Sequence, residues 1–517
     1  MTNIYELKNR LLVPNWRDFK RTIKLGELGE IHDSIHNNIE NSQVKLDWEN
    51  SKTIGIAADL INSSFISNDL FSRELVEAMD FVEANLKDAS DPLMNLVQMI
   101  RLEINPQEVE TSTKILEKNI DSVNEFQSII NDQLLNKMIA KTKNLTKSHL
   151  ANSINWIELA RLYTIRNQSE KAERCITIAL NLAPNNRFVL RSAVRFFIHT
   201  NHEDKAIYYL KKSENIRNDP WLISAHIASS KLVGRYSPFI KIGEGVISSK
   251  KFSNFDLTEL SSSLGTLELE SGSFKKSKPL IDLSLKNPND NSLAQFEWLS
   301  KKDNRLSFNA NSFDEVKNPF EAFAYENFQK GKFLEAFYNC INWFLDVPYS
   351  KRPLVFGSYI ACLVNDYDAA IVMCLAGLRL NNSEVGFINN IVYALCLKNE
   401  LDEVPKYINQ LGRINLSEYN DEDRISIQAT LGLYLLRSKD IDEGKKMYKM
   451  AIENATKIKK DYYKNLAIIN FTRELFLLKD QEFEFYRLLF NKIKTSEVDV
   501  IHFKNEVNTL ITKKYIL

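Results

Sequence analysis

The clearest pattern in the chain is a pair of apolar stripes between Ser153 and Pro184. The first stripe follows the spacing of one helix face, i, i+3, i+4 and i+7: Trp156, Leu159, Ala160 and Tyr163. After the polar break "RNQSEK", a second stripe has the spacing i, i+4, i+7 and i+8: Ala172, Ile176, Ala179 and Leu180. The pattern predicts two antiparallel helices that approach closely at their alanines.

The same pattern returns along the chain, which indicates internal repetition. A copy that starts 34 residues later, at Arg187, ends at Pro220 and keeps its apolar positions: Leu190, Phe197, Ala206 and Leu210. Less regular copies are marked by Leu264 with Gly265, Phe323 with Ala324, Lys351, Val385, and Leu431 with Gly432. Helix pairs repeated in this way stack on one another, so the pattern predicts an array and not one central core.

The unit resembles the tetratricopeptide repeat (TPR), a helix–turn–helix module of 34 residues. The resemblance covers the large positions, the small positions and the closing proline: Trp156, Leu159, Tyr163, Ala160, Ala172, Ala179 and Pro184. Asn167 stands where the family usually has a turn glycine, a role that a polar turn residue can take. The resemblance implies an all-α, right-handed α-solenoid of the kind found in bacterial TPR proteins, with a concave groove lined by the first helix of each pair.

Breaks in the pattern suggest how the chain is divided. Residues 234–254 have poor helical periodicity, and residues 301–318 read as a loop. The predicted organisation is an arm or degenerate helices (1–50), a helical region of degenerate repeats (51–150), a first stack (151–300), a linker (301–318), a second stack (319–457) and C-terminal capping helices (458–517).

Composition narrows the class of protein. Lys and Arg together number 67, as do Asp and Glu, so the net charge is zero and a global basic footprint for nucleic acid is missing. The five cysteines are odd in number and form no C-x-x-C pair, which argues against zinc ribbons and a disulfide framework and favours a reducing, cytoplasmic location. The longest apolar run, residues 369–378, is about half of a membrane span, so no membrane association is expected.

The chain lacks the short motifs that carry chemistry. No phosphate-binding glycine loop, zinc-protease motif or nucleophile elbow occurs in it. We therefore expect a non-enzyme without cofactor or metal. An enzyme whose unrecognised site lies in residues 1–150 remains an alternative.

Tyrosines recur at the ninth position of three successive units: Tyr325, Tyr359 and Tyr393. In the family that the pattern resembles, this position faces the groove, where tyrosine offers apolar area with a hydrogen-bonding tip. Asn389 and Asn390, one turn before Tyr393, could hydrogen-bond an extended peptide backbone. The alternative is that these tyrosines only pack between neighbouring helices.

A second predicted groove surface is basic. Arg161, Arg191 and Arg195 occupy groove positions of two units, with His226 as a neighbour, and such guanidinium groups suit a carboxylate or phosphate partner. The alternative is a solvated charged face with internal partners such as Glu158 and Glu173.

The sequence thus predicts a scaffold or adaptor that binds a protein or peptide segment in its concave groove. By analogy with the family, it would be a regulatory or assembly subunit of a larger complex, for instance in a bacterial defence or toxin system. A nucleic-acid-binding helical repeat is the main rival, since related repeats read RNA, and assembly into a homo-oligomer stays open.

Overall fold

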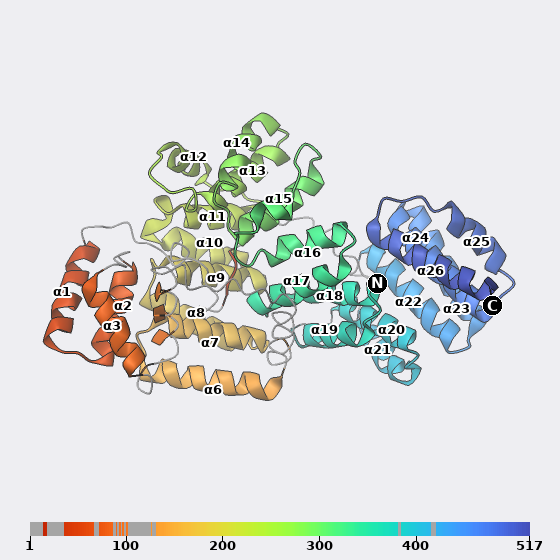
Figure 1. Ribbon diagram of the computed structural model, residues 1–517, viewed down its shortest axis with the longest axis horizontal. Helices are drawn as coiled ribbons and strands as arrows, with labels where there is room; N and C mark the ends of the chain where they lie inside the picture. Colours follow the sequence, from red (N-terminus) through yellow and green to blue (C-terminus); the bar gives the residue numbers. More distant parts are fainter. Residues whose placement is uncertain are drawn as a thin grey trace. The chain divides into compact units, whose positions relative to one another are not determined.

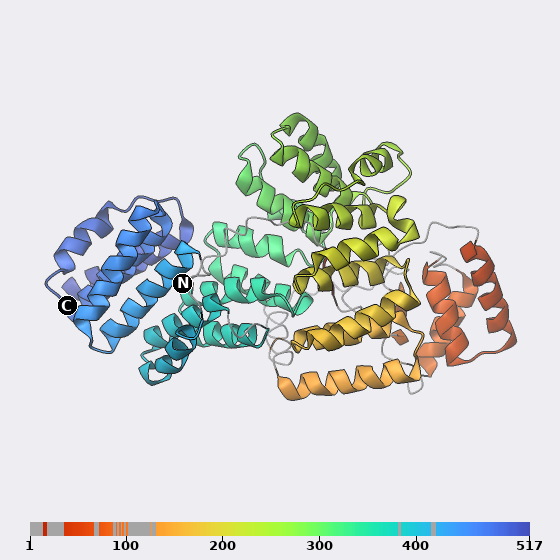
Figure 2. The same ribbon diagram turned by 180° about the vertical axis from the view of Figure 1, so that it is seen from behind.

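The computed structural model describes residues 14–17, 36–66, 72–85, 131–380, 384–414 and 420–516, with isolated positions at 89, 93, 94, 96, 97, 100, 101 and 126. Within these residues every regular element is a helix, and consecutive helices pack in pairs (Figures 1 and 2). The predicted fold class, an all-α solenoid of TPR-like helix–turn–helix repeats, is confirmed.

The chain divides into two compact units. Unit 2 comprises Asn9–Pro319 together with Leu345–Tyr349. Its helices are α1 (His36–Asn50), α2 (Ile54–Ile66), α3 (Arg73–Ala84), α6 (Asp132–Ser148), α7 (Ser153–Ile165), α8 (Ser169–Leu182), α9 (Arg187–His199), α10 (Glu203–Lys212), η4 (Glu214–Arg217), α11 (Pro220–Leu232), α12 (Ile240–Ser248), α13 (Thr258–Glu270), α14 (Phe274–Ser284), α15 (Asp290–Lys302) and η5 (Ala310–Phe313). The pairs α7–α8, α9–α10 and α13–α14 form the repeats predicted from the apolar stripes.

Unit 1 comprises Met1–Lys8, Phe320–Phe344 and Ser350–Leu517. Its described helices are α16 (Phe320–Gln329), α17 (Phe333–Asp346), α18 (Lys351–Leu363), α19 (Tyr367–Leu380), α20 (Val385–Lys398), η6 (Leu401–Glu403), α21 (Val404–Leu411), α22 (Asp421–Arg437), α23 (Ile441–Lys457), α24 (Asp461–Leu478), α25 (Phe483–Lys492) and α26 (Val498–Ile516). The last two residues of α17 and the turn after it belong to unit 2.

Short polar side chains start the first helix of several repeats. Asn152 accepts hydrogen bonds from the amides of Ile154 and Asn155. The Asp219 side chain likewise accepts hydrogen bonds from the amides at the start of α11. These caps satisfy amides that a helix leaves without an internal partner.

Between the two helices of a repeat, the chain turns at a residue with positive φ. Asn167 and Asn201 lie 34 residues apart, and so do Gly331, Asn365 and Asn399. All five have φ between 57° and 72°, the left-handed conformation that glycine and asparagine adopt most readily. The turn role expected for Asn167 is therefore confirmed by its backbone.

Two irregular stretches of the sequence prove to be packed. Residues 234–254 contain α12, and Gly243 of that helix lies so close to Leu260 that an added Cβ would be 3.0 Å from its Cδ1. In residues 301–318, Leu306 joins the core formed by Ile281 and Phe296. The predicted domain boundaries themselves stay predictions. In the part of the chain that the structure describes, no helix is both long and apolar enough to cross a membrane.

Candidate peptide-binding site

A short segment outside any helix or strand, residues 14–17, lies against α9, the start of α15 and the turn after α17. We call it the arm segment; it falls within the predicted arm. The Trp16 indole is fully buried, edge-on to Phe196 with 6.2 Å between ring centroids, and 5.4 Å from the ring of Tyr349. We call the surface that receives the segment, formed by Phe196, Asp290, Asp346 and Tyr349, the arm site. All of it belongs to unit 2.

One hydroxyl group satisfies both backbone groups of Trp16. The Trp16 amide donates to Tyr349 Oη at 3.2 Å, and the Tyr349 hydroxyl donates to the Trp16 carbonyl at 3.1 Å. Burial raises the pKa of Tyr349, although Arg195 acts in the opposite direction, so the hydroxyl keeps the proton that it donates. Since these bonds go to the main chain, they recognise backbone groups and not a particular side chain.

Two carboxylates hold the basic end of the arm segment. Arg17 Nε donates to Asp346 Oδ2 at 3.3 Å, and its Nη2 pairs with Asp290. The side-chain Nδ2 of Asn15 donates to the same Asp290 oxygen at 2.7 Å. Asp290 is the first residue of α15 and Asp346 the last of α17. The guanidinium fork can reach both carboxylates at once, which a lysine ammonium does less well.

The arginines of the predicted basic surface lie in two different environments, internal ion pairs and the border of the arm site. Arg191 forms a bidentate pair with Glu259, at 2.7 and 3.0 Å, and its guanidinium lies 4.7 Å from the centre of the Trp221 ring. Arg161 bonds to Glu158 at 3.2 Å, as the alternative with internal partners supposed. Arg195 instead borders the arm site, 5.8 Å from the Tyr349 ring centroid. The partner-binding role of the three arginines stays a prediction.

Glu259 is fully buried, and burial by itself raises its pKa. Arg191 and the amides of Asn289 and Asn291, each 2.9 Å from Glu259 Oε1, outweigh this effect and lower the pKa below its ordinary value. The carboxylate therefore stays ionised and ties α9 to α13 and α15. The neighbour expected for the arginines, His226, is also buried; its Nδ1 lies 2.9 Å from Ser237 Oγ, and burial lowers its pKa to about 4.

The three tyrosines of unit 1 are buried against residues of the same chain. Tyr325 stacks on Phe356 with 4.6 Å between ring centroids. The Tyr359 hydroxyl bonds to Asp499 of α26 and lies 3.0 Å from that of Tyr462 of α24. All three are at most 4% exposed: Tyr325, Tyr359 and Tyr393.

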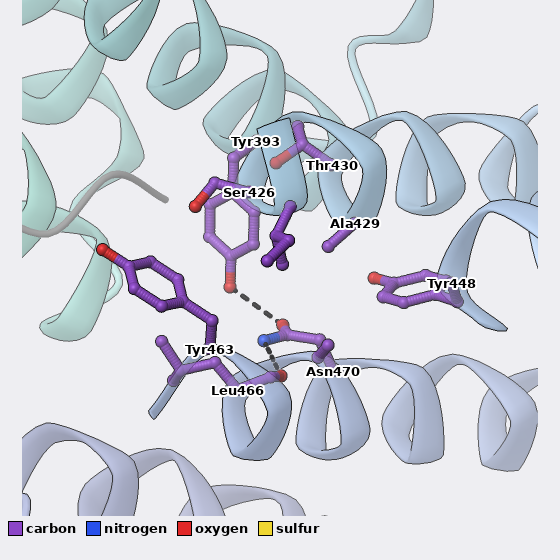
Figure 3. A pocket seen from close by; sticks show the side chains of 10 residues that line it. Tyr393, Ser426, Ala429, Thr430, Tyr448, Tyr463, Leu466 and Asn470 are labelled. Atoms are coloured by element: carbon purple, nitrogen blue, oxygen red, sulfur yellow. Dashed lines mark hydrogen bonds between the residues drawn. The ribbon is translucent and has the colours of Figure 1, made fainter. Parts of the chain in front are cut away.

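Figure 3 shows the surroundings of Tyr393, whose hydroxyl points at the side chain of Asn470 and donates to it at 3.1 Å. The cavity beside it measures about 30 Å³, room for about one water molecule and not for a peptide. Asn390 donates to Ser358 at 3.2 Å, whereas both polar side-chain atoms of Asn389 are buried without a hydrogen bond. A role of these tyrosines and asparagines in binding a partner stays a prediction; in this structure the C-terminal helices lie over the tyrosine positions.

The described residues offer little for catalysis. The five cysteines are buried, and burial raises the pKa of Cys175 and of Cys374 to about 12 each, which disfavours the nucleophilic thiolate. Across the described residues, no group of three or more His, Cys, Asp or Glu side chains is placed to hold a metal ion.

The arm site itself was missed at the level of sequence. "VPNWRDF" is visible as an aromatic–basic stretch in a region of weak periodicity. Nothing in it points to Tyr349, 333 residues further along the chain.

No protein-family model matches the chain, and no curated protein matches it. Solved structures of similar fold include the human IFIT1 dimer with PPP-AAAA, which is 14% identical and has a TM-score of 0.29, over 74% of this chain and 95% of that one. An IFIT1 monomeric mutant with Gppp-AAAA is 12% identical with the same TM-score, over 94% of this chain and 98% of that one.

Proposed function

We propose that the chain is a non-enzymatic TPR-type scaffold that binds an extended segment of a partner protein at the arm site of unit 2. The observation that carries the proposal is the capture of Trp16, whose backbone amide and carbonyl both bond to Tyr349 Oη. A surface that pairs with extended main chain, buries one aromatic ring and neutralises one guanidinium has the elements of a peptide site.

The charge of the arm site bears on the kind of partner. Asp290 and Asp346 give it two carboxylates that suit a basic side chain and would repel a phosphate backbone. A protein segment therefore fits the site better than RNA does. As a scaffold that holds such a segment, the chain would serve as a regulatory or assembly subunit of a larger complex in the cell interior.

The test uses a chain whose own segment no longer fills the site, with Trp16→Ala and Arg17→Ala together; we call it the arm variant. A displayed library of ten-residue peptides is selected on the arm variant, and the best binder is measured by fluorescence anisotropy. We expect micromolar binding that weakens at least tenfold when Asp346→Asn is added. The matched control is Asp282→Asn, which removes a carboxylate from an exposed surface pair with Lys278 and should leave affinity unchanged.

Nucleic acid is examined with the same proteins. Random-sequence RNA is titrated against the arm variant and the wild-type chain in gel shifts at 50 and 200 mM salt. If the RNA binds tightly while the library yields no peptide, the proposal is wrong and the nucleic-acid alternative takes its place. Peptide binding with weak, strongly salt-dependent RNA binding supports the proposal.

A further inference from the structure

We infer that residues 14–17 are a tethered competitor for the arm site, and that the partner segment which replaces them carries an aromatic residue followed by arginine in extended conformation. This inference rests on the proposed function, because it names the ligand chemistry and the regulation of the same site.

The ligand chemistry follows from which contacts of the arm segment depend on a side chain. The bonds to Tyr349 Oη use only backbone atoms and accept any residue other than proline at that point. Trp16 packs edge-on against Phe196 and at a tilt against Tyr349, contacts that favour an aromatic ring at this position. The two carboxylates beyond it select a guanidinium at the next residue. An aromatic–arginine pair is therefore the smallest motif that makes the ring and guanidinium contacts, while the bond from Asn15 to Asp290 depends on the residue before the pair.

The fit of the arm segment is incomplete, and this favours its replacement. Trp16 Nε1 is buried without a hydrogen-bond acceptor, and Asp290 Oδ1 and Arg195 Nε are buried without partners. A buried polar group without a partner destabilises the bound state, because it has lost its hydrogen bonds to water. A segment with phenylalanine in place of tryptophan, or with an acceptor near Arg195, would leave fewer such groups. The segment in place thus binds less tightly than the site allows.

The scaffold does not need the arm segment to complete its repeats. α9 packs against α10 and α11, and α15 packs against α13, through residues of the helices themselves. Glu259, with Arg191, Asn289 and Asn291, joins α9, α13 and α15 without any atom of residues 14–17. The site would therefore persist when the segment leaves.

The tether determines by how much the arm segment lowers the apparent affinity of an external ligand. A segment tethered to its site acts at an effective concentration on the order of 1 mM. If the segment binds the site with a dissociation constant of about 10–100 µM, the filled state is about ten- to a hundredfold more populated than the empty state. The apparent affinity of an external ligand is then lower by the same factor.

The first experiment measures this factor with a fluorescein-labelled peptide of residues 11–20, "LLVPNWRDFK". We expect the peptide to bind the arm variant at least tenfold more tightly than the wild-type chain. Arg305→Ala, which breaks an exposed pair with Asp303 in the same unit, should bind it like the wild type. A peptide with both tryptophan and arginine replaced by alanine should not bind the arm variant.

The second experiment needs no mutation, so a folding defect in the arm variant cannot obscure it. Hydrogen exchange of residues 14–17 in the wild-type chain is followed by mass spectrometry with and without excess isotope-labelled peptide. We expect the Trp16 amide, which donates to Tyr349, to exchange several-fold faster with the peptide, while amides of α13 keep their rates.

The outcomes separate the two claims. Equal affinity of the peptide for the wild-type chain and the arm variant, or unchanged exchange at Trp16 under saturating peptide, overturns the tethered competitor. If the library nevertheless yields peptides that depend on Asp346, the proposed function survives. If neither the library nor the residue 11–20 peptide binds any form of the chain, both claims fall.

Discussion

At the residue scale, the arginines of α9 show how strongly the surroundings decide the role of a side chain. Arg191 and Arg195 lie one turn apart on one helix, yet the first holds Glu259 and the second lies over Tyr349. Both were predicted to face an external carboxylate or phosphate partner. Arg191 does bind a carboxylate in a bidentate manner, but that carboxylate lies 68 residues away in the same chain. Residue type indicated the chemistry, whereas only the fold could identify the partner.

Removal of the Glu259 charge should destabilise unit 2. Glu259→Gln leaves Arg191 buried opposite a neutral amide, and loss of one member of a buried pair costs about 3 kcal/mol. We expect a lower midpoint in urea unfolding followed by circular dichroism. Asp282→Asn, in the exposed pair with Lys278, serves as the control and should change stability by less than about 0.5 kcal/mol. A Glu259→Gln chain as stable as that control would mean that the pair contributes nothing.

At the scale of the element, periodicity predicted the helices well and the turns in part. Wherever apolar residues recur at helical spacing, as in α7 and α8, a helix forms. The sequence did not predict α12, because Gly243 and Gly245 interrupt the helical spacing of its apolar residues. Gly243 is needed there for close approach to Leu260 and Ile223, a requirement that only the packed structure reveals.

Two helical glycines should respond in opposite ways to alanine. A Cβ on Gly377 of α19 would lie 2.2–2.5 Å from ring atoms of Phe387, whereas one on Gly245 would meet nothing within 4 Å. Alanine in an open helix position gains about 0.5–1 kcal/mol, while overpacking costs about 1–3 kcal/mol. We expect Gly245→Ala to raise the thermal midpoint and Gly377→Ala to lower it. A raised midpoint for both would show that α19 and α20 can separate without penalty.

On the scale of the whole molecule, sequence reasoning predicted repeats and C-terminal capping helices but not what the helices cover. α24 and α26 supply Asn470, Tyr462 and Asp499, which bond to the predicted ligand-binding tyrosines of unit 1. In unit 2, the arm segment contacts Asp290, Asp346 and Tyr349, none of which the sequence had indicated. Contacts between positions 77 to 333 residues apart follow from how the chain folds back on its repeats, which no local pattern contains.

The packing of α26 gives a test of its capping role. Phe503 is buried, whereas Ile501 on the same helix is 41% exposed. Phe503→Ala should cost about 3–4 kcal/mol by leaving a cavity, and Ile501→Ala less than about 1 kcal/mol. The measurement is amide protection in α18, α24 and α26, which pack together. Protection that is equal in the two variants would show that α26 does not stabilise these helices.

The left-handed residues at the repeat turns also bear on how such a chain diverges. An apolar position tolerates any side chain of similar size, and a surface position tolerates nearly anything. The turn positions, such as Asn167, Asn365 and Asn399, instead favour residues that adopt positive φ at low energetic cost. Asn365 and Asn399 keep the 34-residue interval, as do Asn167 and Asn201, so the repeat shows in the backbone conformation of its turns even where the side chains of two copies differ.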